Sequence, residues 1–283
     1  MSDDNEVRLG HQNLIDYSRA STQWASKGSL HQDRSALFFA GGSWIPVVGN
    51  GAFRTDDAAE PTAFLAETDA FFCRRKRGYS IKVRDDGTDD DLQAACEARG
   101  LVPLGDPTPQ MICHERLDTP ALPEGITVRL VRNEQGVADF AAVDADAYGT
   151  YGMPADVFVE LFDRPQRLIA DVQTAIVVAY QGGQPVATAL TFLSSGVASL
   201  QWVGTIAAAR QSGLGRVVTV WATNVAFDMG ATSVTLQASP MGAPLYDKLG
   251  YETRYHYRDY VCWTAPVPAH ATSIGSPPRS AER

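Results

Sequence analysis

One stretch of the sequence, Val203 to Arg216, constrains the fold of this chain more than any other. The residues before it, from Ala198 to Ile206, are rich in β-formers, and the segment from Gly215 to Met229 carries apolar side chains at helical spacing. Gly213 and Gly215 therefore lie where a strand is followed directly by a helix. Because glycine has no Cβ, it can adopt a positive φ and let a ligand approach the main chain. The stretch predicts a strand, a ligand-binding turn and a helix.

The start of that helix is expected to bind an anion. The first N–H groups of a helix have no partner within it, and they lie at the positive end of the helix dipole. Arg210 and Arg216 add positive charge. Two familiar phosphate motifs do not fit: a P-loop needs Lys-Ser/Thr after Gly215, and the dinucleotide fingerprint needs a glycine where Val218 stands. An ordinary helix cap without a ligand remains the alternative interpretation.

A pattern that does fit is Q/R-x-x-G-x-G/A, met by Arg210, Gly213 and Gly215. It resembles the acyl-CoA loop of the GNAT superfamily of N-acyltransferases, and the order of elements from Ile126 to Trp263 is similar to the whole GNAT fold. The resemblance implies that the pantetheine arm pairs like an extra strand with main-chain groups, while N–H groups of the loop hold the pyrophosphate. The residues implied for binding acetyl-CoA are Val203, Gly204, Thr205, Arg210, Gln211, Ser212, Gly213, Leu214, Gly215, Arg216 and Ser239.

The composition argues for a small-molecule partner. The 283 residues include 24 basic and 33 acidic side chains, which gives a net charge of −9. Nucleic acids and anionic membranes are bound through Lys and Arg, so neither is an expected partner. The acidic N-terminus does not resemble a secretory signal, no run is long enough to span a bilayer, and we expect the cytoplasm as the location. The four cysteines and five histidines lack ligand spacing, so neither a disulfide framework nor a metal site is expected.

The first half predicts a mixture of helices and strands. Turn residues and periodicity divide it into a helix over residues 11–25, a hairpin of strands over 36–40 and 44–48, a helix over 60–77 that ends at Gly78, a strand over 79–84, a helix over 89–99 and a strand over 110–113. Residues 116–125 contain two prolines and little periodicity, which indicates a linker.

The second half predicts the elements around the glycine loop. They are a strand over residues 126–131, a helix over 134–148, a short helix over 155–162, strands over 175–180, 185–192 and up to 205, a helix over 215–229, a strand over 233–238, a short helix over 242–249, and β segments over 251–255 and 257–263. The proline-rich and serine-rich residues 265–283 are expected to be a disordered tail.

The two halves share an internal repeat. Residues 79–113 and 232–262 follow the same order of strand, loop, short helix, glycine and strand. The helix over 60–77 then corresponds to the helix over 215–229, but Asp56, Asp57 and Glu60 precede it instead of glycines. Carboxylates at a helix N-terminus repel a pyrophosphate, so we expect a first half that has lost cofactor binding.

The expected fold is therefore α/β of the α+β type, with two tandem GNAT-like domains whose mixed, mostly antiparallel sheets are flanked by helices. We expect a degenerate domain over residues 1–115, a linker over 116–125 and the acetyltransferase domain over 126–264.

The resemblance also implies a proton donor. Tyr246 lies in a segment similar to the family's L-Y-x-x-x-G-F, whose tyrosine protonates the departing thiolate, so Tyr246 is the expected catalytic acid. A phenol is protonated at neutral pH and suits this role, although a core aromatic is the alternative. Where the family often has Asn, this chain has Ser239, whose hydroxyl can still hydrogen-bond the cofactor.

The general base stays open. The family frequently places a Glu on the fourth strand, where this chain offers only Ser199 and Gln201. An acceptor ammonium must lose a proton before it can attack. The candidates are Asp144, Asp146, Glu160, His256 or a chain of water molecules.

Together these observations predict an acyl-CoA-dependent N-acetyltransferase that acts on the primary amine of a small molecule by direct attack in a ternary complex, without a metal. A non-catalytic acyl-CoA-binding or regulatory protein is the alternative, suggested by the missing strand glutamate. The acceptor and the oligomeric state stay open. Candidates for an aromatic acceptor pocket are Tyr148, Tyr151, Met153, Tyr255 and His256, each of which could instead be ordinary packing.

Overall fold

The computed structural model describes residues 3–263, so the tail predicted over 265–283 lies outside the described residues. The elements of the first half are α1 (Asp3–Gln23), β1 (Ser29–Gln32), β2 (Ala36–Ala40), β3 (Asn50–Arg54), α2 (Pro61–Cys73), β4 (Tyr79–Arg84), α3 (Asp90–Ala98), β5 (Val102–Pro103) and β6 (Thr108–Cys113). Those of the second half are β7 (Ile126–Leu130), α4 (Glu134–Gly149), α5 (Ala155–Leu161), α6 (Pro165–Ala170), β8 (Thr174–Gln181), β9 (Gln184–Ser194), β10 (Val197–Thr205), η1 (Ala207–Ala209), α7 (Leu214–Asp228), β11 (Ser233–Gln237), α8 (Ala243–Lys248) and β12 (Glu252–Cys262).

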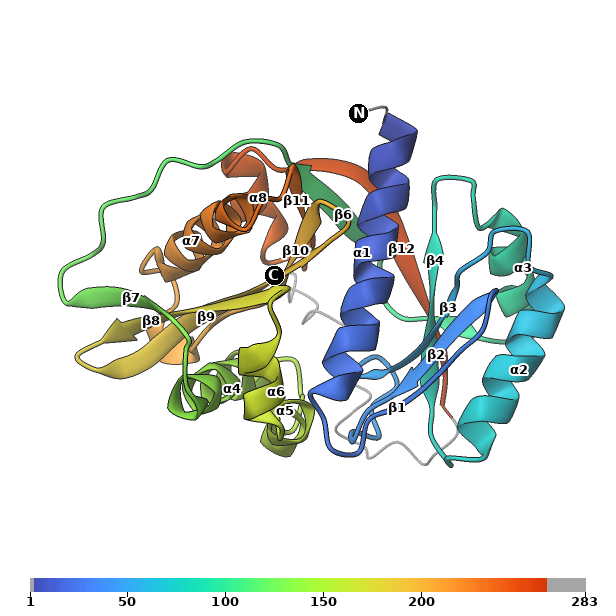
Figure 1. The fold of residues 1–283 in the computed structure, drawn as a ribbon. Helices are drawn as coiled ribbons and strands as arrows, with labels where there is room; N and C mark the ends of the chain where they lie inside the picture. Colours follow the sequence, from blue (N-terminus) through green and yellow to red (C-terminus); the bar gives the residue numbers. More distant parts are fainter. Residues whose placement is uncertain (1–2, 264–283) are drawn as a thin grey trace, which may run out of the picture.

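The strands form one sheet that continues through both halves (Figure 1). Its order is β1-β2-β3-β4-β12-β6-β11-β10-β9-β8-β7, with the short β5 paired to β12. Neighbouring strands are antiparallel except for β3 with β4 and β10 with β11, which are parallel. The predicted α/β class and the mostly antiparallel sheet are confirmed, and the expected two sheets are joined into one.

The two halves exchange their last strands. β6 ends the first half but pairs with β11 of the second, where Thr235 lies opposite Ile112. β12 ends the second half and pairs with β4 of the first, where Tyr260 lies opposite Ile81. β6 and β12 also pair with each other. Each half therefore completes its sheet with a strand from the other half.

Helices cover the sheet on both faces, and side chains on each strand alternate between the two. Val177 of β8 lies in a core with α7, whereas Ile176 and Val178 lie in a second core with α1, α4 and α5. A third core lies in the first half, where α2 and α3 cover β2 and β4. α1 runs along the middle of the molecule and contacts β1, β2, β9 and β10, so it touches both halves (Figure 1).

Several elements of the prediction need correction. Residues 44–48 form a turn, and the second strand of the hairpin is β3. The Asn50 amide holds this turn by donating to the carbonyls of Ser43 at 2.8 Å and Ile45 at 2.9 Å. α2 ends at Cys73, before the predicted end at residue 77. Lys76, which follows it, has the left-handed φ of 52° that glycine usually adopts after a helix, so the helix ends before Gly78 is reached.

The two last β segments are one strand, β12, whose register shifts between Thr253 and Tyr255. The structure also adds α6, β1, β5 and η1, which were not predicted, and begins α1 at Asp3. The remaining helices and strands agree with the prediction to within a few residues at their ends.

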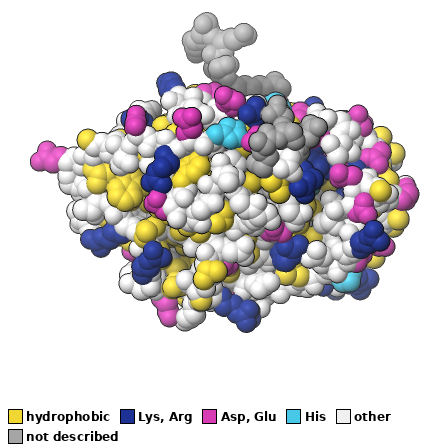
Figure 2. All heavy atoms as spheres, turned by 45° about the horizontal axis from the view of Figure 1, so that its top comes forward, with side chains coloured by type: hydrophobic (Ala, Val, Ile, Leu, Met, Phe, Trp, Pro, Cys, Tyr) yellow, Lys and Arg dark blue, Asp and Glu magenta, His cyan; other side chains and the backbone are white. Residues whose placement is uncertain are grey.

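Charges are mixed on the surface. On the face shown in Figure 2, Lys and Arg side chains are interspersed with Asp and Glu side chains and form no continuous stripe. None of the helices between residues 3 and 263 combines the length and the apolar character that a membrane span needs.

Candidate functional site

A cavity of about 920 Å³ lies beside the glycine loop. Its wall includes, from the second half, the predicted residues Val203, Gly204, Thr205, Arg210, Gln211, Gly213, Leu214, Gly215, Arg216, Ser239 and Tyr246, together with Tyr148 and Tyr151. Ser212, which was also predicted, does not line the cavity, and its hydroxyl donates to the carbonyl of Ala209. The first half supplies another part of the wall, including Tyr17 of α1, Phe39 of β2, Phe53 of β3, and Ser80 and Lys82 of β4. The cavity thus lies between the two halves, which the sequence analysis did not anticipate.

The glycine loop has the backbone that the sequence predicted. Gly213 is the N-cap of α7 with φ of 81° and ψ of 0°, and no side chain caps the helix. Gln211 also has a positive φ, of 62°. A Cβ at Gly215 would lie 3.6 Å from Leu245 Cδ2 and 3.8 Å from Thr205 Oγ1, which is ordinary contact. The first N–H groups of α7 are therefore left without a side-chain acceptor, in the arrangement that suits an anion.

The two arginines of the loop differ in their contacts. Arg210 donates from Nη2 to the Ala147 carbonyl at 3.0 Å and to Thr150 Oγ1 at 3.1 Å. It therefore braces the loop against the C-terminal end of α4, where a cation is favoured by the helix dipole. Arg216 is exposed in the cavity wall. Arg210 was expected to contribute positive charge to cofactor binding, but its guanidinium group is partly engaged in hydrogen bonds within the protein.

β10 separates from β11 beside this loop. The two parallel strands pair only from Val197 to Leu200 on β10. Beyond that point β10 carries a bulge between Gln201 and Gly204, and Trp202 within it has φ of 52°. Trp202 is fixed by a hydrogen bond from its Nε1 to the Tyr17 hydroxyl at 2.6 Å. Main-chain groups of the bulge consequently face the cavity without a strand partner on the β11 side, where an extended ligand could pair.

Tyr246 lies in the cavity wall on α8 and is 7% exposed. Its hydroxyl makes no hydrogen bond to any residue that the structure describes. Burial raises the pKa of Tyr246 to about 12, so it is protonated at neutral pH. A Cβ at Gly242 would lie 2.8 Å from Tyr246 Cε2, so the absence of a side chain there makes room for the ring. Nearby, Ser239 Oγ accepts the Gly242 N–H at 3.1 Å.

The acceptor candidates divide into two groups. Tyr148 and Tyr151 lie in the cavity wall with ring centroids 6.2 Å apart. Met153, Tyr255 and His256 do not line the cavity, which corrects the prediction. Tyr255 is buried with its hydroxyl 2.8 Å from that of Tyr257, and His256 Nδ1 lies 3.3 Å from Asp85. The reason is the strand exchange, which carries β12 to the β4 side of the sheet.

Among the four candidates for the base, three have structural partners. Asp146 accepts the Ala207 N–H at 2.6 Å, Glu160 pairs with Lys27 at 2.7 Å, and His256 lies against Asp85. Asp144 has none among the described residues, although it is fully buried.

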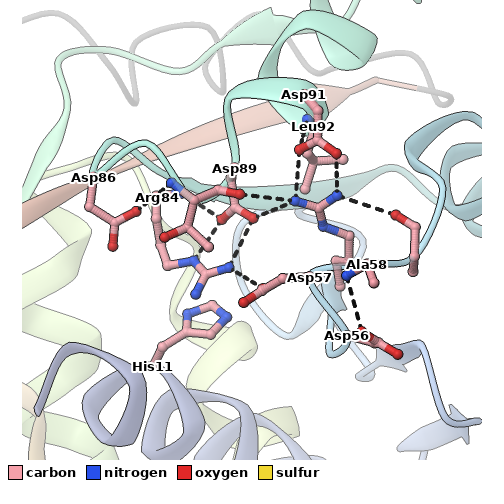
Figure 3. Close-up of polar contacts among 12 residues, drawn as sticks. His11, Asp56, Asp57, Ala58, Arg84, Asp86, Asp89, Asp91 and Leu92 are labelled. Atoms are coloured by element: carbon pink, nitrogen blue, oxygen red, sulfur yellow. Dashed lines mark hydrogen bonds and ion pairs between the residues drawn. The ribbon is translucent and has the colours of Figure 1, made fainter. Parts of the chain in front are cut away.

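The corresponding helix start in the first half is closed by its own side chains. The Glu60 carboxylate accepts the N–H groups of Thr62 at 3.0 Å and Ala63 at 2.6 Å and so caps α2. Asp56 accepts the Ala58 N–H at 3.0 Å, and Asp57 pairs with Arg84 at 2.6 Å (Figure 3). The groups that could hold a pyrophosphate are therefore occupied by carboxylates.

A buried ion-pair cluster fixes this part of the first half. Asp89 pairs with Arg54 at 2.9 Å and with Arg84 at 2.7 Å, and Figure 3 shows the guanidinium group of Arg84 directed at the Asp89 carboxylate. Burial alone would raise the pKa of Asp89, but hydrogen bonds from Arg84 and its charge outweigh burial and lower the pKa to about 2. Asp89 therefore contributes stability above its unfolded pKa of about 3.9, and this contribution is lost as the pH falls toward 2.

Asp89→Asn is expected to reduce the free energy of unfolding by about 3–5 kcal/mol near neutral pH, because both arginines lose a buried counter-charge. Asp91→Asn is the matched control, since Asp91 pairs with the same Arg54 but is 54% exposed, and it should cost less than about 1 kcal/mol. Urea unfolding of the two variants measures the difference. Equal small losses would mean that the cluster does not hold the first half together.

No protein-family model matches the sequence, and no curated protein matches it. The fold is similar to a GCN5-related N-acetyltransferase from Kribbella flavida, at 21% identity over 89% of this chain and 96% of that one, with a TM-score of 0.65. A GCN5-related N-acetyltransferase from Sphaerobacter thermophilus is 17% identical over 84% of this chain and 83% of its own, with a TM-score of 0.59.

A tandem GNAT protein from the clavulanic acid biosynthesis pathway is also similar, at 11% identity over 86% of each chain, with a TM-score of 0.56. The chain thus has the GNAT fold in tandem halves, and the fold predicted from the resemblance is confirmed.

Proposed function

We propose that this chain, with its tandem GNAT fold, is an acyl-CoA-dependent N-acetyltransferase that transfers the acetyl group of acetyl-CoA to the primary amine of a small molecule. The observation that carries the proposal is the uncapped start of α7, where Gly213 leaves the first N–H groups free at the edge of the cavity. A pyrophosphate suits this site, because free N–H groups and the helix dipole both favour an anion.

The other parts of the cavity support the same chemistry. The unpaired bulge of β10 would hold the pantetheine arm and place the thioester near Gly204. The amine would attack the thioester directly in a ternary complex, and Tyr246 would give its proton to the leaving thiolate. A role as proton donor needs a protonated hydroxyl without another partner, and Tyr246 meets both conditions.

Thiol release tests the proposal. Acetyl-CoA and a panel of aromatic and aliphatic primary amines would be incubated with the protein, and free thiol would be followed with a disulfide reagent. Amine-dependent release is the expected result. Binding of acetyl-CoA without release for any amine would favour the non-catalytic acyl-CoA-binding protein, for which the absence of a carboxylate on β10 is the supporting observation.

Calorimetry should give one acetyl-CoA bound per chain, because α7 has an open N-terminus whereas α2 is capped by Glu60. The measurement is the stoichiometry of a titration with acetyl-CoA. A value of two equivalent sites would contradict the proposed division of roles between the halves.

A further inference from the structure

Asp144 is a buried carboxylate that the fold does not neutralise. It is 0% exposed, and neither Oδ1 nor Oδ2 has a hydrogen-bond partner among the described residues. Asp89 is also buried, but its carboxylate is paired with Arg54 and Arg84. Burying a carboxylate without a partner costs several kcal/mol, so such a group calls for an explanation. Packing does not account for the charge, because Asn at this position would fill the same space.

The helical spacing of α4 brings Asp144 to this position. Val137, Phe140 and Ala147 are buried at positions that share a helix face with Asp144, so an acidic residue replaces an apolar one on the inner side of the helix. Tyr148 follows four residues later and is therefore its neighbour along the helix, and its side chain lies in the cavity wall.

Asp144 faces the bulge of β10. A Cβ placed on Gly204 would lie 2.9 Å from Asp144 Oδ1, so only glycine gives the carboxylate room at this point. Gly204 itself lines the cavity at the end of the bulge. The carboxylate thus lies directly behind the part of the wall where the proposed function puts the thioester.

No cation is paired with Asp144: Arg210, which donates to the carbonyl of Ala147 further along α4, makes no hydrogen bond to the Asp144 carboxylate. β9 and β10, which pack against α4, carry no charged residue along their lengths. Two titratable groups near it are Tyr17 of α1 and Tyr148. Burial raises the pKa of both tyrosines, and the charge of Asp144 raises it further. The other elements packed on α4 carry Asp156 and Glu160 on α5, Arg167 on α6 and Tyr180 on β8. None of these groups shifts the pKa of Asp144, which is raised by burial alone.

We propose that Asp144 is the proton acceptor of the reaction, which receives the proton of the acceptor ammonium through the Tyr148 hydroxyl. The inference rests on the proposed function and names a part of the same site. The positive charge of a bound ammonium would supply the partner that the carboxylate lacks and so favour its ionised form. Neither the Tyr148 hydroxyl nor the Asp144 carboxylate has a hydrogen-bond partner among the described residues, so the relay requires the Tyr148 hydroxyl to turn onto the carboxylate when the ammonium binds.

The ammonium nitrogen gives one proton to the Tyr148 oxygen while Tyr148 gives its own proton to the Asp144 carboxylate, which becomes a carboxylic acid. The neutral amine forms a bond to the thioester carbon, and the C–S bond then breaks. The sulfur takes a proton from Tyr246, the amide nitrogen loses its second proton to restore Tyr246 through solvent, and Asp144 releases its proton to water.

The test is Asp144→Asn, assayed from pH 6 to 10 with the amine that gives the fastest thiol release in the screen. At pH 7 kcat/KM should fall roughly 10²- to 10⁴-fold, while the Kd of acetyl-CoA stays within a few-fold of the wild-type value. The loss should shrink as the pH approaches about 10, because the amine then loses its proton in solution. Tyr148→Phe should show the same pH dependence. Asp156→Asn, on the exposed side of α5, is the control and should match the wild type.

A structural role makes different predictions for these measurements. If Asp144 only supported the fold, Asp144→Asn would lower the melting temperature or reduce kcat/KM equally at every pH, and either result without a pH-dependent loss would overturn the inference. Unchanged kcat/KM in Asp144→Asn, with an active wild type, would overturn it while the proposed function stands. A wild type that releases no thiol with any amine would overturn both.

Discussion

Gly215→Glu is expected to abolish binding of acetyl-CoA. The substitution adds bulk and a negative charge in the first turn of α7, beside the N–H groups that we propose for the pyrophosphate. The native site has ordinary contact distances around a Cβ at this position, so the fold should tolerate the change. Calorimetry with acetyl-CoA should detect no binding, and thermal unfolding should show a folded protein.

Two further variants make this result specific. Gly215→Ala adds only a methyl group 3.6 Å from Leu245 and should keep binding. Ala58→Glu puts the same charge near the start of α2, which carboxylates already occupy, and should leave binding nearly unchanged. Similar losses in Gly215→Glu and Ala58→Glu would show that charge anywhere on the molecule weakens binding, contrary to a site at α7.

Tyr246→Phe is expected to lower kcat by a factor of about 10² to 10⁴, the usual contribution of general acid catalysis. The ring and its packing against Tyr251, at a centroid distance of 5.9 Å, remain. Since the hydroxyl makes no hydrogen bond to a described residue, its removal leaves no other group unpaired. Stability and the Kd of acetyl-CoA should therefore change little.

Steady-state thiol release and calorimetry measure these two quantities separately for Tyr246→Phe. A variant with full kcat would leave Tyr246 as a packing residue and assign the proton to water or another group. A large increase in Kd with unchanged kcat would instead mean that the hydroxyl binds the cofactor.

The sequence was most informative where local chemistry decides the structure. The positive φ of Gly213, the start of α7 and the carboxylates at α2 follow from residue types within a few positions of each other. The same locality explains the correct strands β8, β9 and β10, which are consecutive along the chain and joined by short turns. Errors at residues 44–48 arose because apolar β-formers there are held in a turn by Asn50, a contact that periodicity does not report.

Pairing between distant strands was beyond the sequence. β6 and β12 have similar patterns because they belong to a repeat, so nothing in their residues distinguishes the partner in their own half from the one in the other half. The wrong placement of Tyr255 and His256 and the missed wall of Phe53 and Lys82 both follow from this ambiguity. Asp144 was among several candidates, and the helical face that it shares with Phe140 was the available clue to its burial.

The exchange of β6 and β12 also bears on why an inactive half would persist. A duplicate copy attached by a linker alone could be deleted without harm once it lost its ligand. Here, removal of the first half would take β6 away from β11 and leave that edge of the sheet unpaired. It would also leave β12 without any partner strand, because β12 pairs with β4, β5 and β6. The first half is therefore needed for the sheet of the second half, whether or not it binds a cofactor of its own.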